Sequence, residues 1–99
     1  MAKKFYQLTL LDDALKSSVA REAIEQVLNR ATDWFRFAPN CWLIYSSRNA
    51  DIWQNRLIKI PEMKDRAFFV CAIDKEDRGG LIDSHFWDWL DKNRPENPA

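Results

Sequence analysis

The stretch DWFRFAPNCWLIYS, residues 33–46, is the part of the chain from which its architecture is most readily worked out. It holds two runs rich in aromatic and aliphatic side chains, separated by Pro39 and Asn40. Aromatic and β-branched residues are enriched in strands, and Pro and Asn favour turns. The stretch therefore predicts a β-hairpin whose strands cover residues 33–37 and 41–46.

Upstream of this hairpin, apolar residues recur as adjacent pairs every four positions, which is typical of an amphipathic helix that covers a sheet. They are Val19, Ala20, Ala23, Ile24, Val27, Leu28 and Ala31. Ser17 or Ser18 is the expected N-cap of this helix. Before it, residues 5–11 read FYQLTLL and end at two aspartates, a pattern that predicts a strand closing in a polar turn.

Downstream of the hairpin, Asn49 can cap a second helix that ends before Pro61. Residues 66–73 are nearly all apolar and predict a fourth strand. After two glycines, Ser84 opens a short aromatic helix, which we expect to dock on a sheet edge or on a second subunit. Residues 93–99 contain two prolines and no apolar anchor, and they predict a flexible tail.

The order strand, helix, strand, strand, helix, strand predicts an α+β domain over residues 1–92, with the ferredoxin-like βαββαβ arrangement and an added C-terminal helix. Two helices would cover one face of a four-stranded antiparallel sheet. Alternation along the first strand places Tyr6, Leu8 and Leu10 toward the helices. The opposite face, which begins with Phe5, should stay open to water, a partner or a ligand.

Composition limits the classes of function. Fifteen Lys and Arg balance fifteen Asp and Glu, so binding of nucleic acid would need a local basic patch. Five Trp and six Phe in 99 residues are more rings than one small core holds easily, which favours an interface. Cys41 and Cys71 are isolated and predict two reduced, buried thiols. The N-terminus resembles no leader, and we expect a cytoplasmic protein.

Several stretches together resemble the SinR-like family, whose members are related to the small, endoribonuclease-like subunit of the CRISPR spacer-acquisition complex. They are the first strand ending at Asp12, WLIYSS at 42–47 before a helix with Ile52 and Leu57, FV at 69–70, GGLI at 79–82 and WDWL at 87–90. The resemblance spans most of residues 5–92. It implies a ferredoxin-like fold and a homodimer joined through open sheet faces or edge strands.

The resemblance also implies a candidate catalytic site. In the nuclease relatives, an acidic residue at the end of the first strand and its dimer mate hold a divalent metal for phosphodiester hydrolysis. Asp12 occupies that position here, with Asp13 beside it, so both are candidate ligands for Mg²⁺ or Mn²⁺. This chain departs from the relatives at Leu11, where they carry an aromatic residue, and at Asp13. The alternative role for both acids is to end the strand and favour the next helix.

Other candidate residues have a structural alternative too. Ser47 and Arg48 lie in a helix-entry loop, where they could meet a nucleic-acid phosphate or simply cap the helix in solvent. The hairpin rings could stack on bases or fill a core. They are Trp34, Phe35, Phe37 and Trp42. His85, the only histidine, is expected to pack or face solvent rather than to complete a catalytic triad.

The sequence therefore supports three hypotheses about function. The first is a homodimer of a nucleic-acid-linked bacterial or phage system, without robust catalysis and without a cofactor. The second is a metal-dependent nuclease that uses Asp12 at a dimer interface. The third is a regulatory, antitoxin-like module that binds another protein through the open face of its sheet. We expect no membrane partner.

Overall fold

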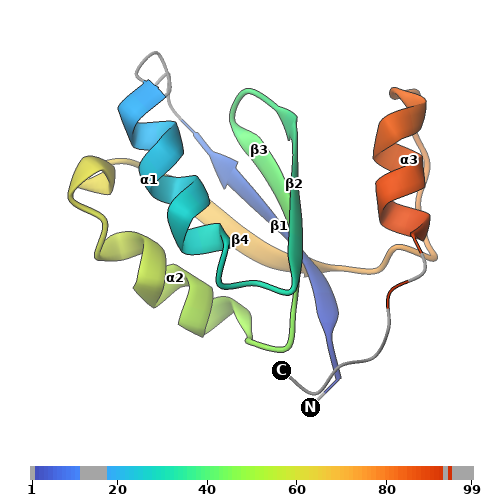
Figure 1. The fold of residues 1–99 in the computed structure, drawn as a ribbon, viewed down its shortest axis with the longest axis horizontal. Coiled ribbons are helices and arrows are strands. Elements are labelled where there is room, and N and C mark those ends of the chain that lie inside the picture. Colours follow the sequence, from blue (N-terminus) through green and yellow to red (C-terminus); the bar gives the residue numbers. More distant parts are fainter. Residues whose placement is uncertain (1, 12–17, 93, 95–99) are drawn as a thin grey trace.

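The computed structural model describes residues 2–11, 18–92 and 94. The elements follow one another as strand, helix, two strands, helix, 3₁₀ turn, strand and helix (Figure 1). They are β1 (Lys4–Leu10), α1 (Ser18–Leu28), β2 (Asp33–Ala38), β3 (Cys41–Ser46), α2 (Ala50–Ile58), η2 (Pro61–Met63), β4 (Phe68–Ile73) and α3 (Ser84–Asp91). The described residues thus form an α+β fold whose element order is consistent with a ferredoxin-like arrangement. No described helix is long and apolar enough to cross a bilayer.

The four strands form one open sheet in the order β2-β3-β1-β4, and every neighbouring pair is antiparallel. The hairpin prediction is confirmed, because β2 and β3 pair directly with a turn at Pro39 and Asn40. Its register shifts between Arg36 and Ala38, where the pairing is irregular. Strand β1 lies in the middle, and β2 and β4 are the two edges of the sheet.

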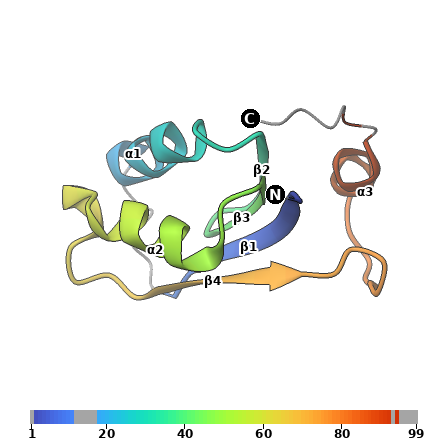
Figure 2. The same ribbon diagram turned by 90° about the horizontal axis from the view of Figure 1, so that it is seen from below.

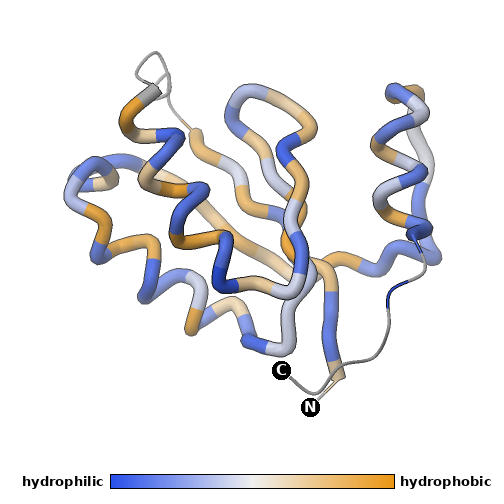
Figure 3. The backbone as a smooth tube through the Cα atoms, in the orientation of Figure 1, coloured by the Kyte–Doolittle hydropathy of each residue, from blue (hydrophilic) through white to orange (hydrophobic). Residues whose placement is uncertain are grey.

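Helices α1 and α2 lie together on the first face of the sheet (Figure 2). The tube of α1 alternates between apolar and polar residues, as the fourfold spacing of its sequence predicts (Figure 3). The main core lies between these helices and the strands. Its fully buried members include Leu8, Ile24, Leu28, Trp42, Ile44, Trp53 and Leu57. Each aliphatic side chain buried in this way stabilises the fold by about 2 kcal/mol.

The predicted alternation of β1 is also confirmed. Tyr6, Leu8 and Leu10 belong to the main core, whereas Phe5 packs in a second cluster on the opposite face. The N-cap of α2 is Asn49, whose side-chain Oδ1 accepts a hydrogen bond of 3.0 Å from the backbone N–H of Ile52. This cap satisfies one of the donors that a helix start leaves without an internal partner.

The second face is not fully open, and the prediction that it would be was wrong in part. Helix α3 crosses to that face and covers its β2-β3-β1 side, so the molecule has helices on both sides of the sheet (Figures 1 and 2). Leu90 is buried there against Phe5 and Leu43. The Trp89 ring stacks on Phe35, with their centroids 5.7 Å apart. The aromatic helix therefore uses this sheet itself as its docking surface.

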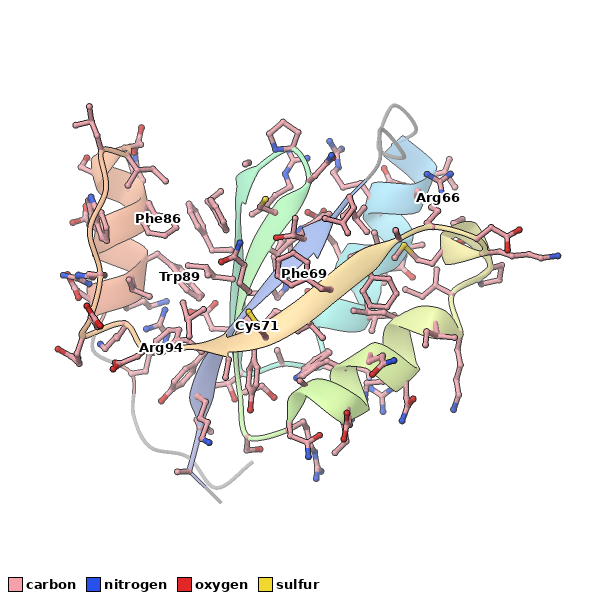
Figure 4. The ribbon with its side chains drawn as sticks, turned by 180° about the vertical axis from the view of Figure 1, so that it is seen from behind. Arg66, Phe69, Cys71, Phe86, Trp89 and Arg94 are labelled. Atoms are coloured by element: carbon pink, nitrogen blue, oxygen red, sulfur yellow. The ribbon has the colours of Figure 1, made fainter. Side chains whose placement is uncertain are left out.

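The β4 side of the second face stays uncovered. Phe69 is 43% exposed and Cys71 is exposed, and both lie on this edge strand (Figure 4). Cys41 is half-buried, so the prediction of two buried thiols was wrong for Cys71, although both cysteines are free. The reason is that β4 is an edge strand whose end at Ile73 packs in the cluster of α3, whereas Cys71 and Phe69 before it do not belong to that cluster. An apolar run on an edge strand is not enough to bury every second residue.

Candidate nucleic-acid interface

The two aspartates predicted to hold a metal, Asp12 and Asp13, lie outside the described residues. These stop at Leu11 and resume at Ser18. Within the described ranges, no three His, Cys, Asp or Glu side chains gather closely enough to hold a metal ion. The predicted metal-dependent site at Asp12 therefore stays a prediction.

Ser47 and Arg48 lie where the sequence places them, in the turn between β3 and α2. The turn is shaped by its own side chains, because the backbone N–H of Arg48 donates to Ser46 Oγ at 3.0 Å and Asn49 caps the helix. The Arg48 side chain is exposed. The local hydrogen bonds thus fix the backbone and leave this guanidinium in solvent.

Two further arginines lie near Arg48. Arg30 follows the end of α1, and Arg56 lies on the last turn of α2. Partial burial, followed by the charges of Arg30 and Arg48, lowers the pKa of Arg56. The like charges are therefore close enough to repel one another. We refer to Arg30, Arg48 and Arg56 as the arginine cluster.

The arginine cluster has few compensating contacts. None of its guanidinium groups forms an ion pair with any residue that the structure describes. The Arg56 group packs over the Trp53 ring at 4.9 Å from its centroid. Arg56 Nη1 and Trp53 Nε1 are both buried and have no hydrogen-bond partner among the residues that the structure describes. A bound anion would offset the positive charge of the arginines at the surface, whereas Trp53 belongs to the buried main core and is not part of that surface.

Polar neighbours limit the extent of this patch. Asp51 lies in the first turn of α2 and lines a pocket with residues of β4, so it belongs to the β4 side of this helix. Lys4, at the start of β1, pairs with Ser46 at the end of β3. The backbone of Lys4 therefore lies beside the turn that holds Arg48. The cluster is thus a local basic patch in a chain whose overall charge is zero, which is the arrangement that the composition requires for nucleic-acid binding.

A second group of contacts made by a cationic side chain lies beside α3, around Arg94 (Figure 4). Its side chain is only 7% exposed, and its guanidinium lies 4.4 Å from the centroid of the Trp89 ring, 5.1 Å from Tyr45 and 5.5 Å from Phe5. Its Nε donates to Asp33 Oδ2 at 3.1 Å, and its Nη2 donates to the Trp89 carbonyl at 2.6 Å. Arg94 therefore joins the end of α3 to β2 and to the rings of the second face.

The hairpin rings are already occupied within the fold. Trp42 is fully buried in the main core, and α3 covers Phe35 and Phe37. The indole N–H of Trp34 donates to Asn29 Oδ1 at 2.8 Å. The structure therefore favours a packing role for these four rings over base stacking.

His85 is exposed, which is one of the two roles that the sequence predicts for it, and its partner is local. Its Nδ1 lies 2.8 Å from Asp83 Oδ1, and Asp83 also caps α3 by accepting from the His85 backbone N–H. These hydrogen bonds lower the pKa of Asp83. The pair begins a helix, and no nucleophile is placed against the ring by the contacts of the described residues.

Comparisons with family models, with curated proteins and with solved structures gave no match to this chain.

Sequence reasoning identified Arg48 but missed Arg30, Arg56 and Arg94. Arg30 follows the end of α1 and Arg56 lies on α2, so they come near one another only when α1 and α2 pack side by side, and no local pattern joins them. Arg94 lies in the predicted tail, where Pro95 beside it suggested an unanchored segment. A usable signal for Arg94 was the aromatic excess, because buried rings attract guanidinium groups.

Proposed function

We propose that this chain is a nucleic-acid-binding protein of ferredoxin-like βαββαβ fold that acts as a homodimer, without robust catalysis, in a bacterial or phage system related to that of the SinR-like proteins. The strand order β2-β3-β1-β4 and the two helices on one face support the ferredoxin-like assignment. The kinship rests on the sequence resemblance alone.

The arginine cluster is the observation that carries the proposal. Arg56 is partly buried beside the charges of Arg30 and Arg48, and none of the three forms an ion pair with a described residue, so a bound anion would stabilise this group of cations. Arginine is suited to phosphate, because its planar donors can engage two phosphate oxygens at once. The exposed Arg48 side chain and the helix start behind it add donors at the same place. A phosphate backbone is the ligand that matches this set.

The test measures the binding of labelled single-stranded RNA, single-stranded DNA and duplex DNA by fluorescence anisotropy at several salt concentrations. The double variant Arg30→Ala/Arg48→Ala should bind at least about tenfold more weakly at about 50 mM salt. The slope of log affinity against log salt should shrink by about 1.5 to 2, because two phosphate contacts are lost. Arg56 is left in place because it packs on Trp53.

Arg36→Ala is the matched control. Arg36 is also exposed, but it lies near the far end of the hairpin, toward Pro39. Its loss should change neither affinity nor salt slope by a measurable amount. A wild-type protein that binds none of the three nucleic acids at low salt would refute the proposal, as would equal losses in the double variant and in the control.

The uncovered side of β4 supports the homodimer. Strand β4 reads FFVCAI and contains no charged residue or proline. Natural edge strands usually carry such residues to prevent unwanted pairing. Phe69 and Cys71 are exposed on it, next to the polar side chains of β1. A second copy that pairs with this edge would cover the surface that α3 leaves open.

Phe69→Lys should convert the dimer to a monomer, because the new charge would be buried in the proposed interface. The molar mass is measured by light scattering during size-exclusion chromatography over a range of concentrations. Leu81→Lys, at a fully exposed loop residue away from the sheet, is the control and should remain dimeric. A monomeric wild-type protein at the highest concentration would show that β4 serves another purpose.

A further inference from the structure

A shallow pocket lies on the second face of the sheet, beneath the end of α3, with a volume of about 360 Å³. It is separate from the arginine cluster, which belongs to the side of α1 and α2. Four cationic side chains and two rings line it. They are Lys3, Lys75, Lys92, Arg94, Phe5 and Tyr45.

The acidic groups near this pocket are already engaged. Asp91 is the one carboxylate among its described lining residues, and Arg78 binds both of its oxygens at 2.7 and 2.9 Å. Asp33 lies outside the lining and is shared between Arg94, at 3.1 Å, and Lys92, at 3.5 Å. Lys92 and Arg94 thus share Asp33, and Lys3 and Lys75 are the two lining cations that form no ion pair with a described residue, so the pocket has an excess of positive charge.

Lys3 provides the decisive observation. Its Nζ atom is shielded from solvent and has no hydrogen-bond partner within residues 2–11, 18–92 and 94. An ammonium group has three donors, and leaving them without water or acceptors is costly. Lys75 is little better provided, because its Nζ reaches only the Leu90 carbonyl at 3.4 Å and otherwise lies over the Phe5 ring at 5.5 Å. Both ammonium groups border the same pocket, and neither forms an ion pair with a residue that the structure describes.

We propose that this pocket binds a phosphate group. A tetrahedral anion with several acceptor oxygens can receive hydrogen bonds from Lys3, Lys75 and Lys92 together, whereas a carboxylate offers only two oxygens. The rings are covered by cations, so the pocket selects the charged group rather than a stacked base. The phosphate belongs either to a small phosphorylated molecule or to a nucleic acid, and the site stands independently of the proposed arginine interface.

Inorganic phosphate is the probe, and the readout is the melting temperature of the full chain at constant ionic strength, with chloride as the reference anion. The wild-type midpoint should rise with the logarithm of phosphate concentration, by about 3 °C well above the dissociation constant. Lys3→Met keeps the length of the side chain and removes the unpartnered charge. This variant should melt no lower than wild type in chloride and should lose the response to phosphate.

Lys59→Met, at the exposed end of α2, is the matched control and should respond to phosphate as wild type does. No phosphate response in wild type, or the same response in Lys3→Met, would overturn the proposal. Two supporting results identify the source of the phosphate. If Lys3→Met also weakens oligonucleotide binding, the site holds a nucleic-acid phosphate. If oligonucleotide binding is unchanged while the phosphate response is lost, the ligand is a small phosphorylated molecule.

Discussion

Arg94→Ala is expected to lower the free energy of unfolding by about 3 kcal/mol, with the loss centred on α3. The side chain is 7% exposed and makes an ion pair with Asp33, a hydrogen bond to the Trp89 carbonyl and contacts with three rings. Removal of one partner of a largely buried pair leaves the other charge without compensation, which is far costlier than the loss of a surface pair. The cation–π contacts are lost as well.

Urea unfolding followed by circular dichroism and by tryptophan fluorescence measures this effect, and α3 contributes Trp87 and Trp89 to the fluorescence of the five tryptophans. Arg94→Lys should recover less than half of the loss, because an ammonium group cannot present a planar fork to Asp33 and Trp89 at once. Arg78→Ala is the control. It removes a solvent-exposed bidentate pair with Asp91 and a contact with the Trp87 ring, and should cost about 1 kcal/mol or less, clearly below the loss in Arg94→Ala. An Arg94→Ala protein as stable as wild type would mean that α3 is held by its apolar side alone.

Local sequence patterns were sufficient to predict most of the sheet and the two helices on its first face. The alternation of β1 correctly separated Leu8, which faces the helices, from Phe5, which does not. Asn49 was recognised as a cap because capping involves residues only three positions apart. In each case the interaction that fixes the structure lies within a few residues, where a single sequence displays it.

Contacts between distant segments were beyond such reasoning. The placement of α3 depends on the pairing of Trp89 with Phe35 and of Leu90 with Leu43, residues that are far apart in the chain. The aromatic excess correctly indicated that rings lie outside the main core, but a second face of the same sheet absorbs most of them. The candidate site follows the same rule, since the charges of Arg30 and Arg56 meet Arg48 only after the helices pack.

A substitution in the main core, on the other face of the sheet, should affect the unfolding of the whole domain rather than mainly that of α3. Trp42 is the residue that tests this expectation. Trp42→Ala is expected to cost about 4 kcal/mol, because the ring is fully buried between β3 and the helices. The indole also forms a hydrogen bond to a side chain of α1, since its Nε1 donates to Glu25 Oε2 at 3.1 Å. Loss of Trp42 should therefore shift circular dichroism and fluorescence transitions together.

Trp42→Phe and Glu25→Ala separate the two contributions of this side chain. Trp42→Phe keeps most of the apolar volume but loses the hydrogen bond and leaves a small void, so a cost of about 1.5 kcal/mol is expected. Glu25→Ala leaves the ring in place but orphans its N–H, at a cost of about 1 kcal/mol. If Trp42→Phe proved as damaging as Trp42→Ala, the indole hydrogen bond rather than ring volume would hold α1 against the sheet. Equal stability of Glu25→Ala and wild type would instead assign the whole effect to packing.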